Sequence, residues 1–103
     1  MNETEIRTLI ANLTWTFAKT YAKKSPHEYA VVKVGQAYRD EVVEFMKYIF
    51  EHGEKELYFG KPFIVYRIDG RKYWSMARSK DNISGNNYVL NRSMTHNVNT
   101  QYV

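Results

Sequence analysis

Two runs of strand-forming residues flank Asp69-Gly70 in residues 62–76 (PFIVYRIDGRKYWSM), and this pair is typical of a two-residue β-hairpin loop. Such a loop fixes the strand register and places Arg67 opposite Lys72, with Arg71 next to Lys72. Like charges directly opposite each other destabilise a strand pair. We therefore expect the tip of this hairpin to bind an anion.

The same register divides the hairpin side chains between two faces. One face carries Phe63, Val65, Arg67, Lys72, Trp74 and Met76, and the other carries Ile64, Tyr66, Ile68, Arg71, Tyr73 and Ser75. Because large aromatic side chains usually pack, we expect Trp74 to fill the core between the sheet and the helices. For Tyr66 and Tyr73, packing and a role in a binding face with Arg71 both stay open.

Basic and aromatic residues elsewhere extend this set. It comprises Lys19, Arg67, Arg71, Lys72 and Arg92 together with Trp15, Tyr29, Tyr66, Tyr73 and Trp74. Cationic groups bind phosphate, a guanidinium in bidentate fashion, and aromatic faces stack on nucleobases. This combination predicts a nucleotide-like anionic ligand.

His27, between Pro26 and Glu28, is the one histidine placed for chemistry. It could act as a general acid or base with Lys19, or donate to a phosphate. The alternative is a structural histidine that bonds a backbone carbonyl. The chain has no cysteine and no His, Asp or Glu run with ligand spacing, so we expect neither a metal nor a cofactor. Residues 84–87 (SGNN) could cradle a phosphate but lack P-loop spacing.

The charge of the chain is concentrated in its second half. Residues 1–60 hold 8 Lys or Arg against 9 Asp or Glu, whereas residues 61–103 hold 7 against 2. Such asymmetry favours an anionic partner, with nucleic acid as an alternative to a small ligand. No apolar run approaches the ~20 residues that span a bilayer, and the N-terminus carries acids where a secretory leader has basic residues. We expect a cytoplasmic protein with no membrane partner.

Hydrophobic periodicity predicts an α+β fold in the order α-β-α-β-β-β. The expected elements are a helix over 3–24 with Asn2 as N-cap, a strand over 28–34, a helix of about 13 residues capped by Asp40 and ended by a left-handed Gly53, a connection over 54–61, the hairpin, a loop over 77–87 and a strand over 88–92. Thr14, Trp15 and Thr16 are poor helix formers, so an earlier end of the first helix near residue 14 stays open. We expect a mainly antiparallel sheet of three or four strands with both helices on one face. Residues 1–93 would form one domain and 94–103 a flexible tail. The apolar face of the second helix would also suit a homo-oligomer.

Four segments of the chain also form a recognisable pattern. Trp15, Phe17, Ala18, Lys19 and Thr20 precede Pro26-His27-Glu28-Tyr29, which precedes Asp69 to Trp74 (DGRKYW) and Asn91-Arg92. The pattern resembles that of small uncharacterised proteins of bacteria and their phages, over about residues 14–93. The resemblance implies no activity. It implies that Lys19, His27, Tyr29, Lys72, Tyr73, Trp74, Asn91 and Arg92 are the positions of interest. The spacer before Pro26 is longer here, with Lys23 and Lys24.

Together these observations predict a small non-enzymatic protein that binds a nucleotide-like anion. One version, which follows from the resemblance to phage proteins, is a counter-defence sponge that sequesters a cyclic or modified nucleotide signal in the host cytoplasm. A metal-independent phosphodiesterase or ribonuclease that uses His27 and Lys19 is one alternative. A module that blocks a host protein is the other.

Overall fold

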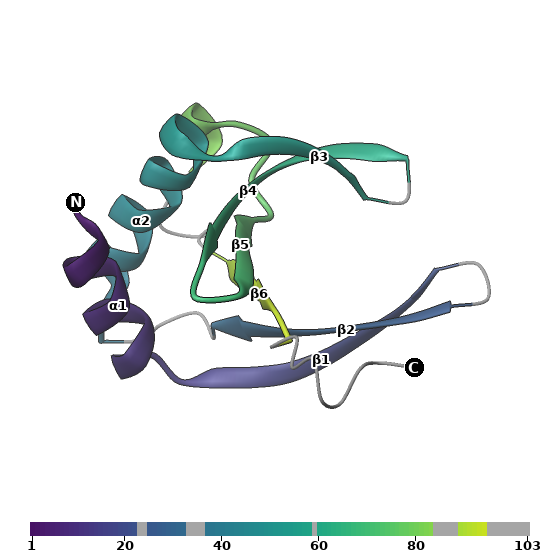
Figure 1. Ribbon diagram of the computed structural model, residues 1–103, viewed down its shortest axis with the longest axis horizontal. Helices are drawn as coiled ribbons and strands as arrows, with labels where there is room; N and C mark the ends of the chain where they lie inside the picture. Colours follow the sequence, from purple (N-terminus) through teal and green to yellow (C-terminus); the bar gives the residue numbers. More distant parts are fainter. Residues whose placement is uncertain (23–24, 33–36, 59, 84–88, 95–103) are drawn as a thin grey trace.

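The structure is a computed structural model that describes residues 1–22, 25–32, 37–58, 60–83 and 89–94. Two helices and six strands follow one another in the chain (Figure 1): α1 (Glu3–Asn12), β1 (Trp15–Ala22), β2 (Ser25–Val32), α2 (Arg39–His52), β3 (Glu54–Tyr58), β4 (Lys61–Ile68), β5 (Arg71–Ser75) and β6 (Leu90–Ser93), with a 3-10 turn at Lys80–Asn82 before β6. The strands form one sheet in the order β1-β2-β6-β5-β4-β3. Every neighbouring pair is antiparallel.

The predicted class is therefore confirmed, but the sheet has six strands rather than three or four. The predicted succession is retained, and the added strands are β1 and β3. The predicted helix over 3–24 ends at Asn12 and is followed by β1, and the predicted connection over 54–61 contains β3, so both predictions are wrong. The expected loop over 77–87 contains a 3-10 turn at Lys80–Asn82. The predicted tail and the candidate phosphate loop at 84–87 lie outside the described residues, apart from Met94.

The first helix is short because its sequence changes character after Asn12. Asn2 and Glu5 form a capping box, in which each side chain accepts a hydrogen bond from the other residue's backbone N–H at 2.8 and 2.9 Å. Thr14, Trp15 and Thr16 then favour extended backbone, since β-branched and aromatic side chains lose rotamer freedom in a helix. The chain enters β1 at Trp15.

Both helices lie on one side of the sheet (Figure 1), as predicted, and enclose the hydrophobic core with it. The apolar face of α2 supplies Val42, Phe45, Met46 and Ile49, all fully buried. These four side chains of α2 are thus buried in the core of the same chain and do not form an exposed face for a second copy. Residue Tyr38, not Asp40, is the N-cap of α2, and Asp40 lies in the first turn, where its charge favours the helix dipole.

The hairpin at Asp69-Gly70 forms with the predicted register. Tyr66 lies opposite Tyr73, Arg67 opposite Lys72 and Ile68 opposite Arg71. Asp69 and Gly70 have φ angles of 52° and 80°, the left-handed backbone of a two-residue hairpin turn. Arg7 of α1 donates from Nε to the Asp69 carboxylate at 2.9 Å and lowers the pKa of that carboxyl.

The prediction that Trp74 fills the core is wrong, and its neighbour Tyr73 takes that place. Tyr73 is 1 % exposed and packs against Phe45 of α2, with ring centroids 5.7 Å apart. The register fixes which side chains share a face, but not which face the helices cover. Ile68 on the Tyr73 face joins the helix-covered core, and so Trp74 points to the opposite face.

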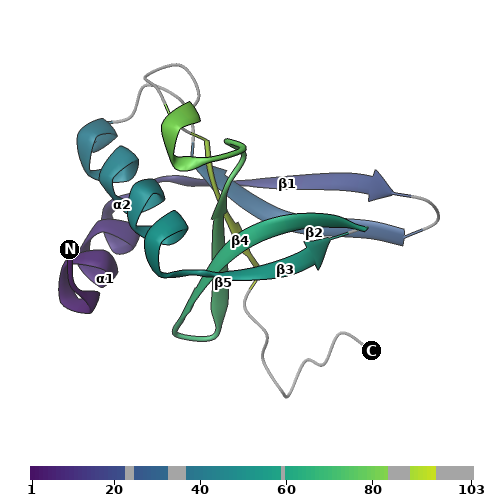
Figure 2. The same cartoon turned by 90° about the horizontal axis from the view of Figure 1, so that it is seen from above.

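Two hairpins project from this core as arms. Strands β1–β2 and β3–β4 extend well beyond the short β5 and β6 (Figure 1), and Figure 2 shows from above that both arms run away from the helices. Only Tyr29, Ala30 and Val31 of β2 pair with β6, and only the last three residues of β4 pair with β5. The two arms therefore leave β5 and β6 as the short centre of the sheet.

Gly53, which joins α2 to β3, has a different role from the predicted one. Its φ is −83°, so it is not left-handed. An added Cβ would instead lie 2.5 Å from the Val65 carbonyl oxygen and 2.6 Å from that of Ile49. Glycine is needed here because two backbone segments approach it closely.

We expect Gly53→Ala to lower the free energy of unfolding by about 2 kcal/mol or more, because backbone atoms must move to admit the methyl group. Gly60→Ala is the matched control: its φ is +80° with nothing within 4 Å of an added Cβ, so only backbone strain of about 1 kcal/mol applies. Urea denaturation of the two variants measures the difference. Equal losses would contradict the close-approach explanation.

Candidate functional site

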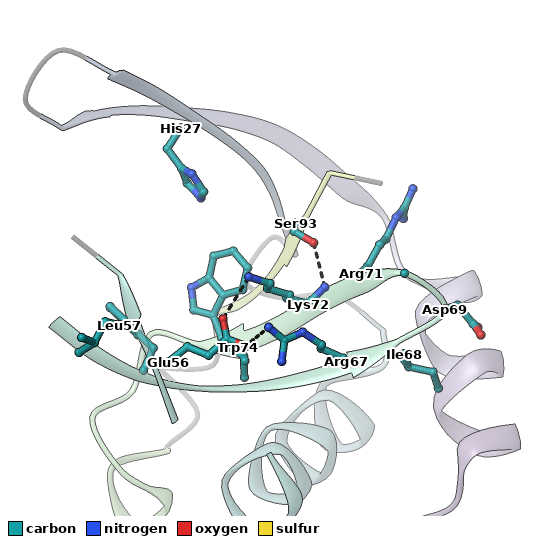
Figure 3. Close-up of a pocket in the computed structure, with 13 residues that line it drawn as sticks. His27, Glu56, Leu57, Arg67, Ile68, Asp69, Arg71, Lys72, Trp74 and Ser93 are labelled. Atoms are coloured by element: carbon teal, nitrogen blue, oxygen red, sulfur yellow. Dashed lines mark hydrogen bonds and ion pairs between the residues drawn. The ribbon is translucent and has the colours of Figure 1, made fainter. Parts of the chain in front are cut away.

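A cavity of about 530 Å³ opens between the two arms. Its lining comes from five strands and the hairpin turn (Figure 3): His27 of β2, Glu56 and Leu57 of β3, Phe63, Val65, Arg67 and Ile68 of β4, Asp69 and Gly70 of the turn, Arg71, Lys72 and Trp74 of β5, and Ser93 of β6. Apolar and aromatic side chains make up much of this wall, with charged groups concentrated near β4 and β5. Concave, mainly apolar sites with a few polar groups are typical of small-molecule binding.

The charge of the facing Arg67 and Lys72 is compensated from within the chain. The Glu56 carboxylate forms an ion pair with Arg67, accepts a hydrogen bond from Lys72 Nζ at 3.0 Å, and so bridges the two cations (Figure 3). A second carboxylate, that of Glu54, lies 3.7 Å from Arg67. The carboxylate next to the facing cations thus comes from β3 of the same chain, and the binding of an external anion at the hairpin tip stays a prediction.

Aromatic rings form a continuous row from β2 to β5. The rings of His27 and Tyr29 stack with centroids 5.7 Å apart, and Tyr29 lies 6.2 Å from Trp74. The Tyr29 hydroxyl hydrogen-bonds to that of Thr20 at 3.0 Å, which fixes the ring from the β1 side. Burial, and secondarily the positive charge of Lys72, lowers the pKa of His27, so the ring is neutral at pH 7.

Asn91 lies on the same face of the sheet, opposite Trp74 on one side and Val31 on the other. It is 1 % exposed, and its amide nitrogen has no hydrogen-bond partner among the described residues. An unsatisfied buried N–H group costs about 1–3 kcal/mol. The Asn91 amide is therefore a buried hydrogen-bond donor next to Trp74 that no described residue satisfies.

The structure brings some of the predicted site residues together and separates others. His27, Arg67, Arg71, Lys72 and Trp74 line the cavity, and Tyr29 and Asn91 lie beside Trp74.

Tyr73 lies in the core, and Arg92, its cross-strand partner, shares its face. Lys19 pairs with Glu28, whereas His27 pairs with Thr20. Because successive strand residues alternate between faces, Lys19 and His27 point to opposite sides of the sheet, which removes the predicted pairing of the two.

Sequence reasoning missed Glu56, Leu57, Phe63 and Ser93 as cavity residues. The first two were assigned to a connection, although Glu54, Glu56 and Tyr58 alternate with Lys55 and Leu57 as in a strand with two distinct faces. Ser93 accepts a hydrogen bond from the Lys72 backbone N–H at 2.8 Å. Nothing in the local sequence signals that contact, because it depends on strand order.

The described residues offer neither a metal site nor a membrane-spanning helix. Within the described ranges, no three His, Asp or Glu side chains gather closely enough to share a metal ion. None of the helices there is long and apolar enough to cross a membrane.

No protein-family model, curated protein or solved structure matches this chain. The resemblance to small bacterial and phage proteins stays a prediction.

We expect the His27 ring to titrate below its usual pKa of about 6.5, because burial disfavours its charged form. The folded state then binds fewer protons than the unfolded state below pH 6.5, so stability falls as the pH drops through the folded pKa. NMR titration of His27, with urea denaturation at several pH values, measures both effects. His27→Gln should weaken this acid destabilisation, whereas the exposed His52→Gln should leave it in place. A His27 midpoint at or above 6.5 would contradict the assignment.

Proposed function

We propose that the cavity between the arms binds a small nucleotide-like anion and that the protein acts as a binder rather than an enzyme. The observation that carries this proposal is the joint placement of Trp74, Arg67 and Lys72 in one concave site of about 530 Å³. That volume lies within the range of sites for ligands of nucleotide size, roughly 300–1,000 Å³. The indole is suited to stacking on a base, and the cations to holding an acidic group.

The Glu56 carboxylate defines how the acidic group would bind. It already engages both Arg67 and Lys72, so a phosphate at these cations must compete with it or displace it. Glu56 belongs to β3, an outer strand that pairs only with β4, and its side chain can turn aside without disturbing the core. The carboxylate would keep the two cations apart and partly neutralised until a ligand arrives.

Arg71 is the third cationic side chain of this site. It also lines the cavity, and it lies one residue from Lys72, on the other face of the strand. A ligand with more than one phosphate or acidic group would be served by Arg71 as well as by Arg67 and Lys72. This arrangement favours di-anionic nucleotides over neutral nucleosides.

One version of the proposal is a sponge that sequesters a cyclic or modified nucleotide used as an immune signal. Thermal-shift and calorimetric titrations with cyclic dinucleotides, linear nucleotides and ADP-ribose derivatives test it. Trp74→Ala should weaken binding about five- to hundredfold, as expected for a lost stacking surface. No stabilisation by any of these compounds would refute the nucleotide proposal, and intact ligand recovered after incubation would separate a binder from an enzyme.

Glu56→Gln should bind an anionic ligand about two- to fivefold more tightly, because the competing charge is removed while the size is kept. The same variant should unfold at lower urea concentration, since Arg67 and Lys72 then repel each other uncompensated. Glu51→Gln on α2, which removes an exposed ion pair with Lys80 of the 3-10 turn, is the matched control and should leave affinity unchanged. Weaker binding by Glu56→Gln would show that the carboxylate contacts the ligand directly.

A phosphodiesterase or ribonuclease is the second candidate, and the neutral His27 at the cavity wall favours it. Such a ring can accept a proton from an attacking hydroxyl, with Lys72 rather than Lys19 near the phosphate. Product formation that disappears in His27→Ala while binding survives would establish this candidate. Retention of intact nucleotide by the native protein would exclude it for that ligand.

A further inference from the structure

The helix-side face of the sheet carries a second cluster of cations and aromatic rings, distinct from the cavity between the arms. Cross-strand pairing defines a row on this face: Phe17 opposite Ala30, Ala30 opposite Arg92, Arg92 opposite Tyr73, and Tyr73 opposite Tyr66. Directly paired residues project to the same side of a sheet. The row begins in the helix-covered core at Tyr66 and Tyr73 and ends in solvent at Phe17.

Arg92 is the central member of this row. Its guanidinium lies over the Trp15 ring, 4.2 Å from the centroid, and Trp15 is in turn fixed by the hydrogen bond that its indole N–H donates to the Ile10 carbonyl at 3.0 Å. Burial, and secondarily the charge of nearby Arg71, lowers the pKa of Arg92. One planar cation is thus oriented by a tryptophan that is itself held in place, close to a second guanidinium.

A hollow of about 190 Å³ lies at this cluster, and Phe17, Arg71 and Met94 line it together with Trp15 and Arg92. Phe17 is 56 % exposed. Lys19 follows on the same face of β1, since residues two apart share a face. The Glu28 carboxylate lies opposite Lys19, and among the described residues Lys19, Arg71 and Arg92 are the cations of this surface.

We propose that this surface binds single-stranded nucleic acid, with phosphates held by Arg92, Arg71 and Lys19 and a base stacked on Phe17. Exposed aromatic rings between cations suit single strands because every base offers a face for stacking, and the backbone offers a charge at each step. A folded acidic protein would need a wider apolar contact than this hollow offers. The proposal shares Arg71 with the nucleotide proposal, since that side chain lines both hollows, but Phe17, Lys19 and Arg92 lie on the face opposite Trp74, Arg67 and Lys72.

The test is fluorescence anisotropy with 5′-labelled ten-nucleotide oligo-dT and oligo-U at low salt. We expect binding of both strands, and two or three phosphate contacts should give a slope of log K against log salt of about −1.5 to −2. Tighter binding of oligo-U would indicate RNA, and tighter binding of oligo-dT would indicate DNA. No binding to either strand, or binding insensitive to salt, would overturn the proposal.

Variants assign any binding to this face. Phe17→Ser should weaken it about five- to hundredfold through lost stacking, with little effect on folding because the ring is exposed. Arg92→Lys keeps the charge but loses the planar group, and should weaken binding in the same direction. Lys47→Gln on α2, an exposed lysine, controls for net charge and should have little effect.

Trp74→Ala separates the two faces. Under this proposal it leaves oligonucleotide affinity unchanged, even though it weakens nucleotide binding in the cavity between the arms. Loss of oligonucleotide binding in Trp74→Ala, with Phe17→Ser unaffected, would place the strand in that cavity and overturn the assignment. Circular dichroism melts of each variant confirm that the changes report binding and not unfolding.

Discussion

The register imposed by the Asp69-Gly70 turn is the constraint on which the rest of the structure depends. A slip of one residue would exchange the faces of every side chain in the hairpin. Tyr73 would then point away from Phe45 and Trp74 into the core, and Arg67 and Lys72 would leave the reach of Glu56. Arg7 of α1 holds the turn itself through Asp69. The core and the cavity are thus fixed by one two-residue loop.

The two faces of the sheet present different chemistry because they have different neighbours. On the face between the arms, cations meet carboxylates of β3, and the aromatic row runs beside them. On the helix-side face, the guanidinium of Arg92 meets an indole ring instead. A cation paired with a carboxylate must release it to bind an anion, whereas one resting on a ring retains its charge for a partner. Under the two proposals, the hollow between the arms binds a small anion and the helix-side face binds an extended strand.

Local signals in the sequence were sufficient for the features that depend on neighbouring residues. The turn, the Arg67–Lys72 pairing, the Asn2 cap and the core of α2 followed from spacing and residue type. The extent of α1 did not, because Phe17 and Tyr21 continue a helical spacing by chance. The helix-covered side of the hairpin and the bridge at Glu56 depend on strand order, which no local pattern encodes. Of the predicted ligand-binding residues, His27, Arg67, Arg71, Lys72 and Trp74 line one hollow, while Lys19, Tyr73 and Arg92 project to the helix-side face of the sheet.

The length of the arms has a consequence for how a ligand would be recognised. Beyond Tyr29 in β2 and Tyr66 in β4, within the described residues, the inward edges of both arms have no neighbouring strand. Their main-chain N–H and C=O groups therefore border the hollow as donors and acceptors that belong to no particular side chain. Main-chain groups keep their chemistry when a neighbouring side chain changes. Many substitutions around the hollow would therefore leave this part of ligand recognition intact.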